Sequence, residues 1–346
     1  MINVALASYG MSGKVFHAPL LSAHPHFHLY KVLERHRAES VERYPEVLIV
    51  KQYEDLLADT QVDVVVVNTP NAYHYDMTRA ALEAGKHVVV EKPFTTTTEE
   101  AQALIELARQ QGQVLTVFQN RRWDSDFRTV QKVLSAGVLG TVVEYEAHYD
   151  RFRNYIQPDT WKEESGPGSG ILYNLGAHMI DQALLLFGMP STLFAKLSIQ
   201  REGGKAPDAY HLILGYDRHQ VVLKSSYLVR DLGPRYKILG NQGTFTKYGI
   251  DPQEDLLKLG VSADNSRIGT ESEDDWGTLD TEFNGLHFRG KIASEYGDYR
   301  SFYDNLYRVL QGEASLAVRA EEARDVIRLI ELAYESDVQG QVLSVS

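Results

Sequence analysis

Short apolar runs alternate with helix-like segments along the first third of the chain. The strand-like runs cover residues 2–7, 29–33, 62–67, 87–90 and 114–117. The four successive valines at 64–67 are apolar on both faces, which is typical of a central strand in a parallel sheet covered by helices on both sides. Helical patterns lie between these runs, over 14–21, 73–83 and 99–110. The alternation predicts βαβ units in a doubly wound α/β sheet over residues 1–120.

From residue 121 the pattern changes to that of a second, α+β domain over 121–346. Strand-like runs follow at 142–148, 193–200, 210–216, 221–227, 236–240 and 244–248, joined by turns rich in Gly, Asp and Asn. This spacing predicts a mainly antiparallel sheet. Helical patterns cover 124–135, 171–187, 294–310 and 320–334, and the last helix could pack back on the first domain. We interpret the polar, turn-rich stretch 251–290 as a surface excursion.

Composition narrows the possible functions. The chain has 346 residues, beyond the size of about 250 at which single cores stop growing, so we expect two domains. It has no cysteine, which excludes disulfides, thiol nucleophiles and cysteine-ligated zinc. The net charge of −12 argues against a nucleic-acid partner. No apolar run reaches the roughly 20 residues of a membrane span, and the N-terminus lacks a basic leader, so we expect no membrane partner and a cytoplasmic location.

The turn after the first predicted strand carries a phosphate-binding pattern. It follows G-x-G-x-x-G, with Ser8 in the place of the first glycine and with Gly10 and Gly13 in the others. Gly10 would let the backbone approach a pyrophosphate, and Gly13 would allow the helix to pack closely on the strand. Because the turn lies between the first strand and the first helix, it favours a Rossmann dinucleotide site that includes Met11 and Ser12, over a turn without a ligand.

The end of the second predicted strand bears on the choice between NAD and NADP. Glu34 stands where a carboxylate would bond the ribose 2′-hydroxyl of NAD, and Arg35 stands where a guanidinium would pair with the 2′-phosphate of NADP. The basic run Arg35, His36 and Arg37 in an otherwise acidic protein favours NADP. NAD remains an alternative, as does a solvated charged turn that binds neither.

Several motifs resemble one enzyme family. The stretch 83–94 (EAGKHVVVEKPF) is similar to the signature of the Gfo/Idh/MocA oxidoreductases, and 13–20 (GKVFHAPL), 119–127 (QNRRWDSDF) and 172–186 are similar to its NADP-dependent scyllo-inositol dehydrogenases. The resemblance implies an open C-terminal sheet whose outer face packs on a second subunit, so that the chain would be a homo-oligomer. It also implies cofactor contacts from Thr69, Asn71, His74, Glu91, Lys92 and Asn120.

Three residues are the candidates for catalysis. Lys92 follows the fifth predicted strand at the carboxyl edge of the sheet, where ligands bind open α/β sheets. Asn174 and His178 are four residues apart and would share one face of a helix, with Asp181 following on much the same side. The family motif has Asp at the position of Asn174, and Asn cannot accept a proton at neutral pH. His178 is therefore the candidate for proton transfer, Asn174 would bind a hydroxyl group, and we expect no metal.

Together these residues predict reversible hydride transfer between a secondary alcohol of a cyclic polyol or sugar and the nicotinamide. His178 would exchange the hydroxyl proton, and Lys92 would stabilise the substrate oxygen. Candidate substrate contacts are Phe16, His17, Arg122, Trp123, Arg153 and Trp161. The alternatives are a reductase of another sugar or keto-sugar in the same family, a redox-assisted glycosidase, and a non-enzymatic regulator that senses a dinucleotide.

Overall fold

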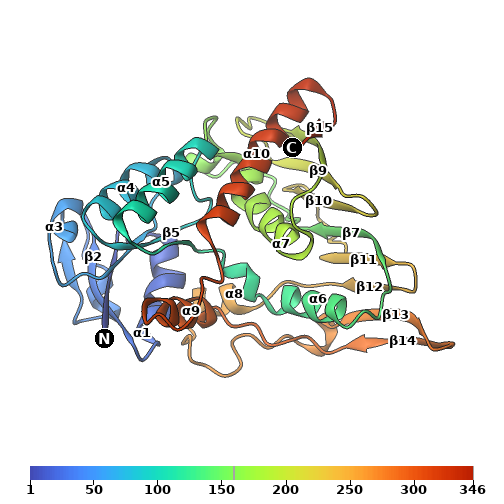
Figure 1. Ribbon diagram of the computed structural model, residues 1–346, viewed down its shortest axis with the longest axis horizontal. Helices are drawn as coiled ribbons and strands as arrows, with labels where there is room; N and C mark the ends of the chain where they lie inside the picture. Colours follow the sequence, from blue (N-terminus) through green and yellow to red (C-terminus); the bar gives the residue numbers. More distant parts are fainter. Residues whose placement is uncertain (159, 346) are drawn as a thin grey trace. The chain divides into compact units, whose positions relative to one another are not determined.

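The chain forms two compact units in a computed structural model that describes residues 1–158 and 160–345 (Figure 1). The first unit contains Met1–Asn120, Pro252–Ile268 and Asp298–Arg324. The second contains Arg121–Asp251, Gly269–Gly297 and the chain from Asp325 onwards. The chain first changes unit between Asn120 and Arg121, and two later segments also belong to the first unit. Helix α10 (Ala320–Gln339) begins in the first unit and continues in the second.

A six-stranded parallel sheet organises the first unit. Its order is β3-β2-β1-β4-β5-β6, which is the strand order of dinucleotide-binding doubly wound sheets. The four valines of β4 are fully buried, as expected for a central strand. The bounds are β1 (Ile2–Leu6), β2 (Phe27–Leu33), β3 (Leu48–Val50), β4 (Val64–Val67), β5 (His87–Val90) and β6 (Leu115–Val117). This arrangement confirms the predicted Rossmann-type fold.

Helices of several lengths connect these strands. Helix α5 shows how the sequence fixes their ends: Thr97 and Glu100 form a capping box at its start, and Gly112, with φ of 66°, ends it in the left-handed conformation. The predicted helix over 14–21 is instead a π-helical turn (Gly13–His17) followed by α1. The helices of this unit are α1 (Ala18–Ser22), α2 (Ser40–Arg43), α3 (Tyr53–Leu57), α4 (His74–Glu83), α5 (Thr98–Gln111), α8 (Gln253–Lys258) and α9 (Arg300–Leu310).

The second unit contains a nine-stranded sheet in the order β14-β13-β12-β11-β7-β10-β9-β8-β15. Every neighbouring pair is antiparallel except β7 with β10, which confirms the prediction of a mainly antiparallel sheet. The bounds are β7 (Val142–His148), β8 (Thr192–Ser198), β9 (Ala209–Gly215), β10 (Gln220–Ser226), β11 (Tyr236–Gly240), β12 (Gly243–Lys247), β13 (Gly277–Phe283), β14 (Leu286–Ile292) and β15 (Leu343–Ser344).

Helices α6 (Ser125–Ser135) and α7 (Ala177–Phe187) cover one face of this sheet (Figure 1). The strands alternate accordingly: in β7, Tyr145 and Ala147 are buried while Glu144 and Glu146 point to the other face. Tyr236 of β11 donates a hydrogen bond to Gln182 of α7, with an oxygen–oxygen distance of 3.0 Å. One face is therefore the core of the unit, and the other is open.

The prediction of a surface excursion over 251–290 was wrong. This segment contains α8, β13 and most of β14, and the two strands pair along their length. The hairpin turns at Asn284 and Gly285, which have φ of 48° and 78°. Asn-Gly is the preferred pair for the type I′ turn of a two-residue hairpin, so the dipeptide itself was the overlooked signal. Within the described residues, no helix combines the length and apolar character needed to cross a bilayer.

Candidate functional site

Ser8 and Asn68 hold the glycine turn that follows β1. The Ser8 backbone N–H donates to Asn68 Oδ1 and the Asn68 side-chain amide donates to the Ser8 carbonyl, both at 2.9 Å. The Ser8 hydroxyl donates to the Asn68 carbonyl, also at 2.9 Å. Ser8 thus uses its side chain to join the ends of the adjacent strands β1 and β4. These strands lie at the switch point of the sheet, where doubly wound folds bind dinucleotides.

The two glycines of the turn differ in the space around them. A Cβ atom at Gly13 would lie 2.7 Å from the Ser8 carbonyl oxygen and 3.0 Å from Asn68 Nδ2. At Gly10 the nearest atom to such a Cβ, Ser8 Oγ, would be 3.7 Å away, and Gly10 and Met11 are exposed. The turn is closed at Gly13 and open at Gly10. This is the arrangement that a pyrophosphate cradle requires, so the residues present fit a dinucleotide.

Glu34, at the end of β2, is buried and bonded to its own chain. Its carboxylate accepts hydrogen bonds from the backbone N–H groups of Glu39 at 2.8 Å and Ser40 at 3.0 Å. It also accepts one from the Ser40 hydroxyl. Three donors at the start of α2 therefore occupy the carboxylate that was predicted to bind a ribose hydroxyl.

A group of charged side chains lies beside this loop. Glu39 accepts hydrogen bonds from Lys14 Nζ and from Arg37 Nη1, the latter at 2.8 Å. Lys14 Nζ also lies 5.6 Å from the centre of the Tyr9 ring. Burial raises the pKa of Tyr9 to about 12, so its hydroxyl keeps its proton. Arg35, which lies in the same loop, is exposed.

The segment around Lys92 is fixed on both sides. The Lys92 N–H donates to Glu91 Oε2 at 3.1 Å, and the bond from Lys92 to Pro93 is cis. After it, His74 Nδ1 lies 2.8 Å from the Pro93 carbonyl, while His74 Nε2 lies 2.9 Å from the Thr69 carbonyl. Burial lowers the pKa of His74, and the hydrogen bonds to the Thr69 and Pro93 carbonyls offset this shift only in part. His74 thus ties the end of β4 to the segment after β5.

Four further predicted residues of the first unit are buried, whereas Ser12 and Thr69 are half-buried. Phe16 packs against Phe118 and Tyr299, with ring centres 6.3 Å and 6.0 Å apart. His17 is completely buried and bonded at both ring nitrogens. These contacts favour packing and positioning roles for both residues over direct substrate contact. Asn71 and Asn120 are also buried.

In the second unit, a π-helical turn (Leu172–Gly176) precedes α7. Asn174 lies in this turn and His178 in the first turn of α7, so their spacing does not follow the regular α-helical face that the sequence predicts. π-Helical turns inside helices are frequent at functional sites. Asn174 Nδ2 donates to the Tyr227 hydroxyl at 3.4 Å, and His178 is buried.

Tyr227 is the residue of this region that the sequence reasoning missed. Two guanidinium groups lie near its ring, with Arg153 5.3 Å and Arg201 4.7 Å from the ring centre. Arg201 is itself held by Glu163 at 2.6 Å and by Asp208 at 2.8 Å. The buried ion pairs of Arg201 thus help to hold the Tyr227 ring, whose hydroxyl group contacts Asn174. No local motif marks Tyr227, because its partners are distant in sequence.

Arg122 and Asp181 form a buried bidentate ion pair. Arg122 Nε donates to Asp181 Oδ2 at 2.8 Å, and Nη2 donates to Oδ1 at 2.6 Å. This pairing favours a structural role for Arg122. Trp123 and Trp161 are half-buried, and the Lys162 ammonium lies 5.8 Å from the Trp161 ring centre. Among residues 1–158 and 160–345, no cluster of three or more His, Asp or Glu side chains is arranged to hold a metal ion.

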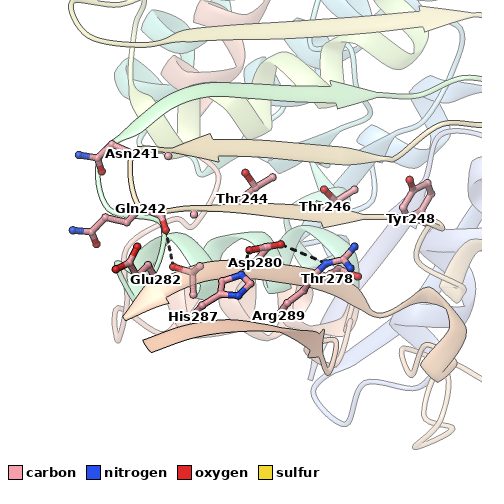
Figure 2. Close-up of a pocket in the computed structure, with 13 residues that line it drawn as sticks. Asn241, Gln242, Thr244, Thr246, Tyr248, Thr278, Asp280, Glu282, His287 and Arg289 are labelled. Atoms are coloured by element: carbon pink, nitrogen blue, oxygen red, sulfur yellow. Dashed lines mark hydrogen bonds and ion pairs between the residues drawn. The ribbon is translucent and has the colours of Figure 1, made fainter. Parts of the chain in front are cut away.

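A separate hollow of about 730 Å³ lies along β11 to β14 (Figure 2). Asp280 pairs there with His287 at 2.8 Å and with Arg289 at 3.4 Å. The lining includes Thr244, Thr246 and none of the residues predicted for catalysis. These paired side chains are largely exposed, and the buried hydroxyl of Thr281 in the lining already donates to main-chain carbonyls.

Comparisons with known proteins agree with both units. The family profile described as "Oxidoreductase family, NAD-binding Rossmann fold" matches residues 2–119, and that described as "Oxidoreductase family, C-terminal alpha/beta domain" matches 131–345. The chain is 39% identical to the scyllo-inositol 2-dehydrogenase (NADP(+)) of Bacillus subtilis over 343 residues, which cover 99% of this chain and 95% of the relative. The oxidoreductase YdgJ of Escherichia coli is 40% identical over 335 residues, with 97% and 96% covered. A crystal structure from Bacteroides fragilis superposes with a TM-score of 0.92 at 45% identity, covering 100% of both chains.

Proposed function

The chain belongs to the Gfo/Idh/MocA family of oxidoreductases, and we propose that within it the protein is an NADP-dependent dehydrogenase of a cyclic polyol resembling scyllo-inositol. The observation that carries this proposal is the placement of Lys92. It follows β5 directly, at the carboxyl edge of a dinucleotide-binding sheet, and its main chain is fixed by Glu91. The B. subtilis relative named for this reaction supports the substrate class.

In the proposed reaction Lys92 donates a hydrogen bond to the reacting oxygen and stabilises its developing negative charge. When bound, the nicotinamide supplies the hydride acceptor. Ser8, Gly10, Met11, Ser12 and Gly13 would hold its phosphates.

His178 removes the hydroxyl proton in the direction of alcohol oxidation and returns it in ketone reduction. An imidazole suits this role because its ordinary pKa is near neutrality, so both protonation states are accessible. Asn174 binds the same hydroxyl or a neighbouring one. Its contact with Tyr227 supports this assignment, because the phenol helps to fix the orientation of the amide.

The preference for NADP over NAD is supported by the hydrogen bonds that Glu34 makes within its own chain. Three donors of its own chain occupy its carboxylate, which leaves it poorly placed to be the main acceptor for a ribose 2′-hydroxyl. Arg35 is exposed beside it, and Lys14 and Arg37 supply further positive charge. A 2′-phosphate bound here would interact with several cations, and it would have to displace Glu39 from Lys14 and Arg37.

The catalytic assignment is tested by Lys92→Ala and His178→Ala. Each should lower kcat by about 10²–10⁴ while the melting temperature and NADPH affinity remain those of the wild type. Lys258→Ala and His287→Ala serve as matched controls, because both residues lie on the surface in ion pairs. Turnover close to that of the wild type in either catalytic variant would remove that residue from the mechanism.

The open face of the nine-stranded sheet is the surface that we propose for self-association. It carries the outward-pointing residues of β7, including Glu144 and Glu146, opposite the face covered by α6 and α7. Sedimentation of the purified chain measures the oligomeric state, and a monomer at all concentrations would contradict this assignment.

A further inference from the structure

Three buried polar side chains of the first unit form a hydrogen-bonded chain that ends at Lys92. The Tyr303 hydroxyl of α9 lies 2.6 Å from His17 Nδ1. His17 Nε2 lies 2.9 Å from Glu91 Oε1, and Glu91 Oε2 accepts the Lys92 N–H at 3.1 Å. The four residues come from the π-helical turn after β1, the end of β5 and α9, so their meeting is a tertiary feature.

The carboxylate at one end fixes the direction of the hydrogen bonds that it accepts, and with a neutral imidazole the remaining bond follows. A carboxylate only accepts, so His17 Nε2 must carry the proton that it donates to Glu91. In the neutral imidazole Nδ1 is then an acceptor, and the Tyr303 hydroxyl donates to it. The order is therefore Tyr303 to His17 to Glu91, with the Lys92 N–H donating to the second carboxylate oxygen. Every member is satisfied without any change of protonation.

The pKa shifts of the two end groups, Glu91 and Tyr303, determine their protonation states. Burial raises the pKa of Glu91, but the hydrogen-bonding and electrostatic interactions with His17, and then the positive charge of Lys92, lower it by more, so the net shift is downward. Burial, and then the charge of Glu91, raise the pKa of Tyr303 well above its ordinary value. Glu91 is therefore a carboxylate at neutral pH, and Tyr303 remains a hydroxyl donor.

The surroundings of the chain are apolar. The Tyr303 ring packs against Phe27, Phe118 and Phe302, with ring centres 5.7, 6.1 and 5.3 Å apart, and the His17 ring lies 4.4 Å from that of Phe118. Burying a carboxylate, an imidazole and a phenol among aromatic rings is unfavourable unless each is hydrogen-bonded. An apolar core would fill this space at lower cost, so the polar chain calls for a role beyond packing.

We propose that His17, oriented by Tyr303, is a positioning residue for the lysine: through the Glu91 carboxylate it fixes the main chain of Lys92 and so directs its ammonium group. The inference rests on the catalytic role proposed for Lys92. It also assigns a use to Glu91 and to His17 that differs from direct contact with cofactor or substrate.

Two substitutions at position 17 separate positioning from packing. The amide nitrogen of Gln lies near the place of the His Nε2 atom and can still donate to Glu91, whereas that of Asn lies near Nδ1 and cannot. We expect His17→Gln and Tyr303→Phe to lower kcat by about fivefold, the effect of one lost hydrogen bond. His17→Asn should lower kcat by about 10²-fold, as misplacement of a catalytic group does, with KM nearly unchanged.

His24 provides the matched control. It is also buried and also bonded to α9, through Asp304 at 3.0 Å, and it makes no contact with Glu91. His24→Asn should keep the kcat of the wild type. Equal losses in His17→Asn and His17→Gln, or a loss in His17→Asn expressed only in KM, would overturn the inference.

A readout without substrate separates this inference from the proposed function. Lysines labelled with ¹³C-methyl groups give NMR signals, and the signal of Lys92 is identified by its absence in Lys92→Arg. It should move in His17→Asn and stay near its wild-type position in His17→Gln and His24→Asn. If the wild type oxidises no polyol but this signal behaves as described, the proposed substrate is wrong and the positioning stands. An unmoved signal in His17→Asn would refute the positioning, whatever the activity.

Discussion

The glycine turn after β1 gives the prediction that depends most directly on atomic geometry. In Gly13→Ala the new methyl group would lie 2.7 Å from the Ser8 carbonyl oxygen and 3.0 Å from Asn68 Nδ2. These are the two atoms of a 2.9 Å hydrogen bond that joins the ends of β1 and β4. The methyl group can be accommodated only if this bond is stretched or the turn moves.

The size of the effect follows from those contacts. Overpacking a tight site costs about 1–3 kcal/mol, and weakening one buried hydrogen bond adds about 1 kcal/mol. We therefore expect Gly13→Ala to lower the free energy of unfolding by about 2–4 kcal/mol, a substantial part of the roughly 5–15 kcal/mol typical of a domain. Gly10→Ala should leave it within about 0.5 kcal/mol, because its methyl group meets its nearest neighbour at an ordinary 3.7 Å.

Urea unfolding followed by far-ultraviolet circular dichroism measures this difference. Tryptophan fluorescence is unsuitable, because Trp123, Trp161 and Trp276 all lie in the second unit. NADPH binding, titrated by its own fluorescence, should weaken at least about tenfold in Gly10→Ala, equivalent to about 1.4 kcal/mol. If Gly13→Ala unfolds at the urea concentration of the wild type, the steric argument is wrong. If Gly10→Ala binds NADPH normally, this turn does not hold the pyrophosphate.

Three further predictions concern charge. Arg35→Ala should raise KM for NADP⁺ about 10- to 100-fold, the worth of a charge-assisted hydrogen bond, and leave KM for NAD⁺ unchanged; equal losses would contradict its role. Asn174→Asp should move the acid limb of the kcat/KM profile for oxidation up by about one pH unit, because a nearby carboxylate favours the protonated form of the general base, while Asn174→Ala leaves the limb in place. Burial lowers the pKa of His148, but Asp150 and Glu146 raise it more, so the net shift is upward. Its contribution to stability is present at low pH and disappears as pH rises through that raised pKa, and thermal melts of His148→Asn should lack this dependence.

The sequence predicted most of the architecture because local pattern determines it. The buried valines of β4 and the capping box of α5 need only near neighbours, and both elements form where expected. The β13–β14 hairpin was missed because the segment 251–290 is rich in polar and turn-forming residues, although burial alternates along β13 and Asn284-Gly285 marked the turn. The π-helical turns are likewise invisible to a reading that assumes regular α-helical periodicity.

The candidate site could be predicted only where a motif is local. The glycine turn and the segment around Lys92 are such motifs. The contact of Asn174 with Tyr227 joins residues 53 positions apart, and that of His17 with Tyr303 joins residues 286 positions apart. In the sequence, His17 next to Phe16 resembles a residue that contacts substrate. Only its tertiary partners, Glu91 and Tyr303, show that its side chain is part of the buried interior.

The central claim is that the protein oxidises a cyclic polyol with NADP⁺, and its most direct test is the initial rate of the purified full chain at 340 nm. The panel should contain inositol isomers and aldoses, each with NADP⁺ and with NAD⁺, and an aryl glycoside as a separate arm. We expect oxidation of a scyllo-inositol-like polyol, with kcat/KM for NADP⁺ exceeding that for NAD⁺ by at least about tenfold, or about 1.4 kcal/mol. No turnover with any alcohol, or release of sugar from the glycoside without net change in the cofactor, would contradict it.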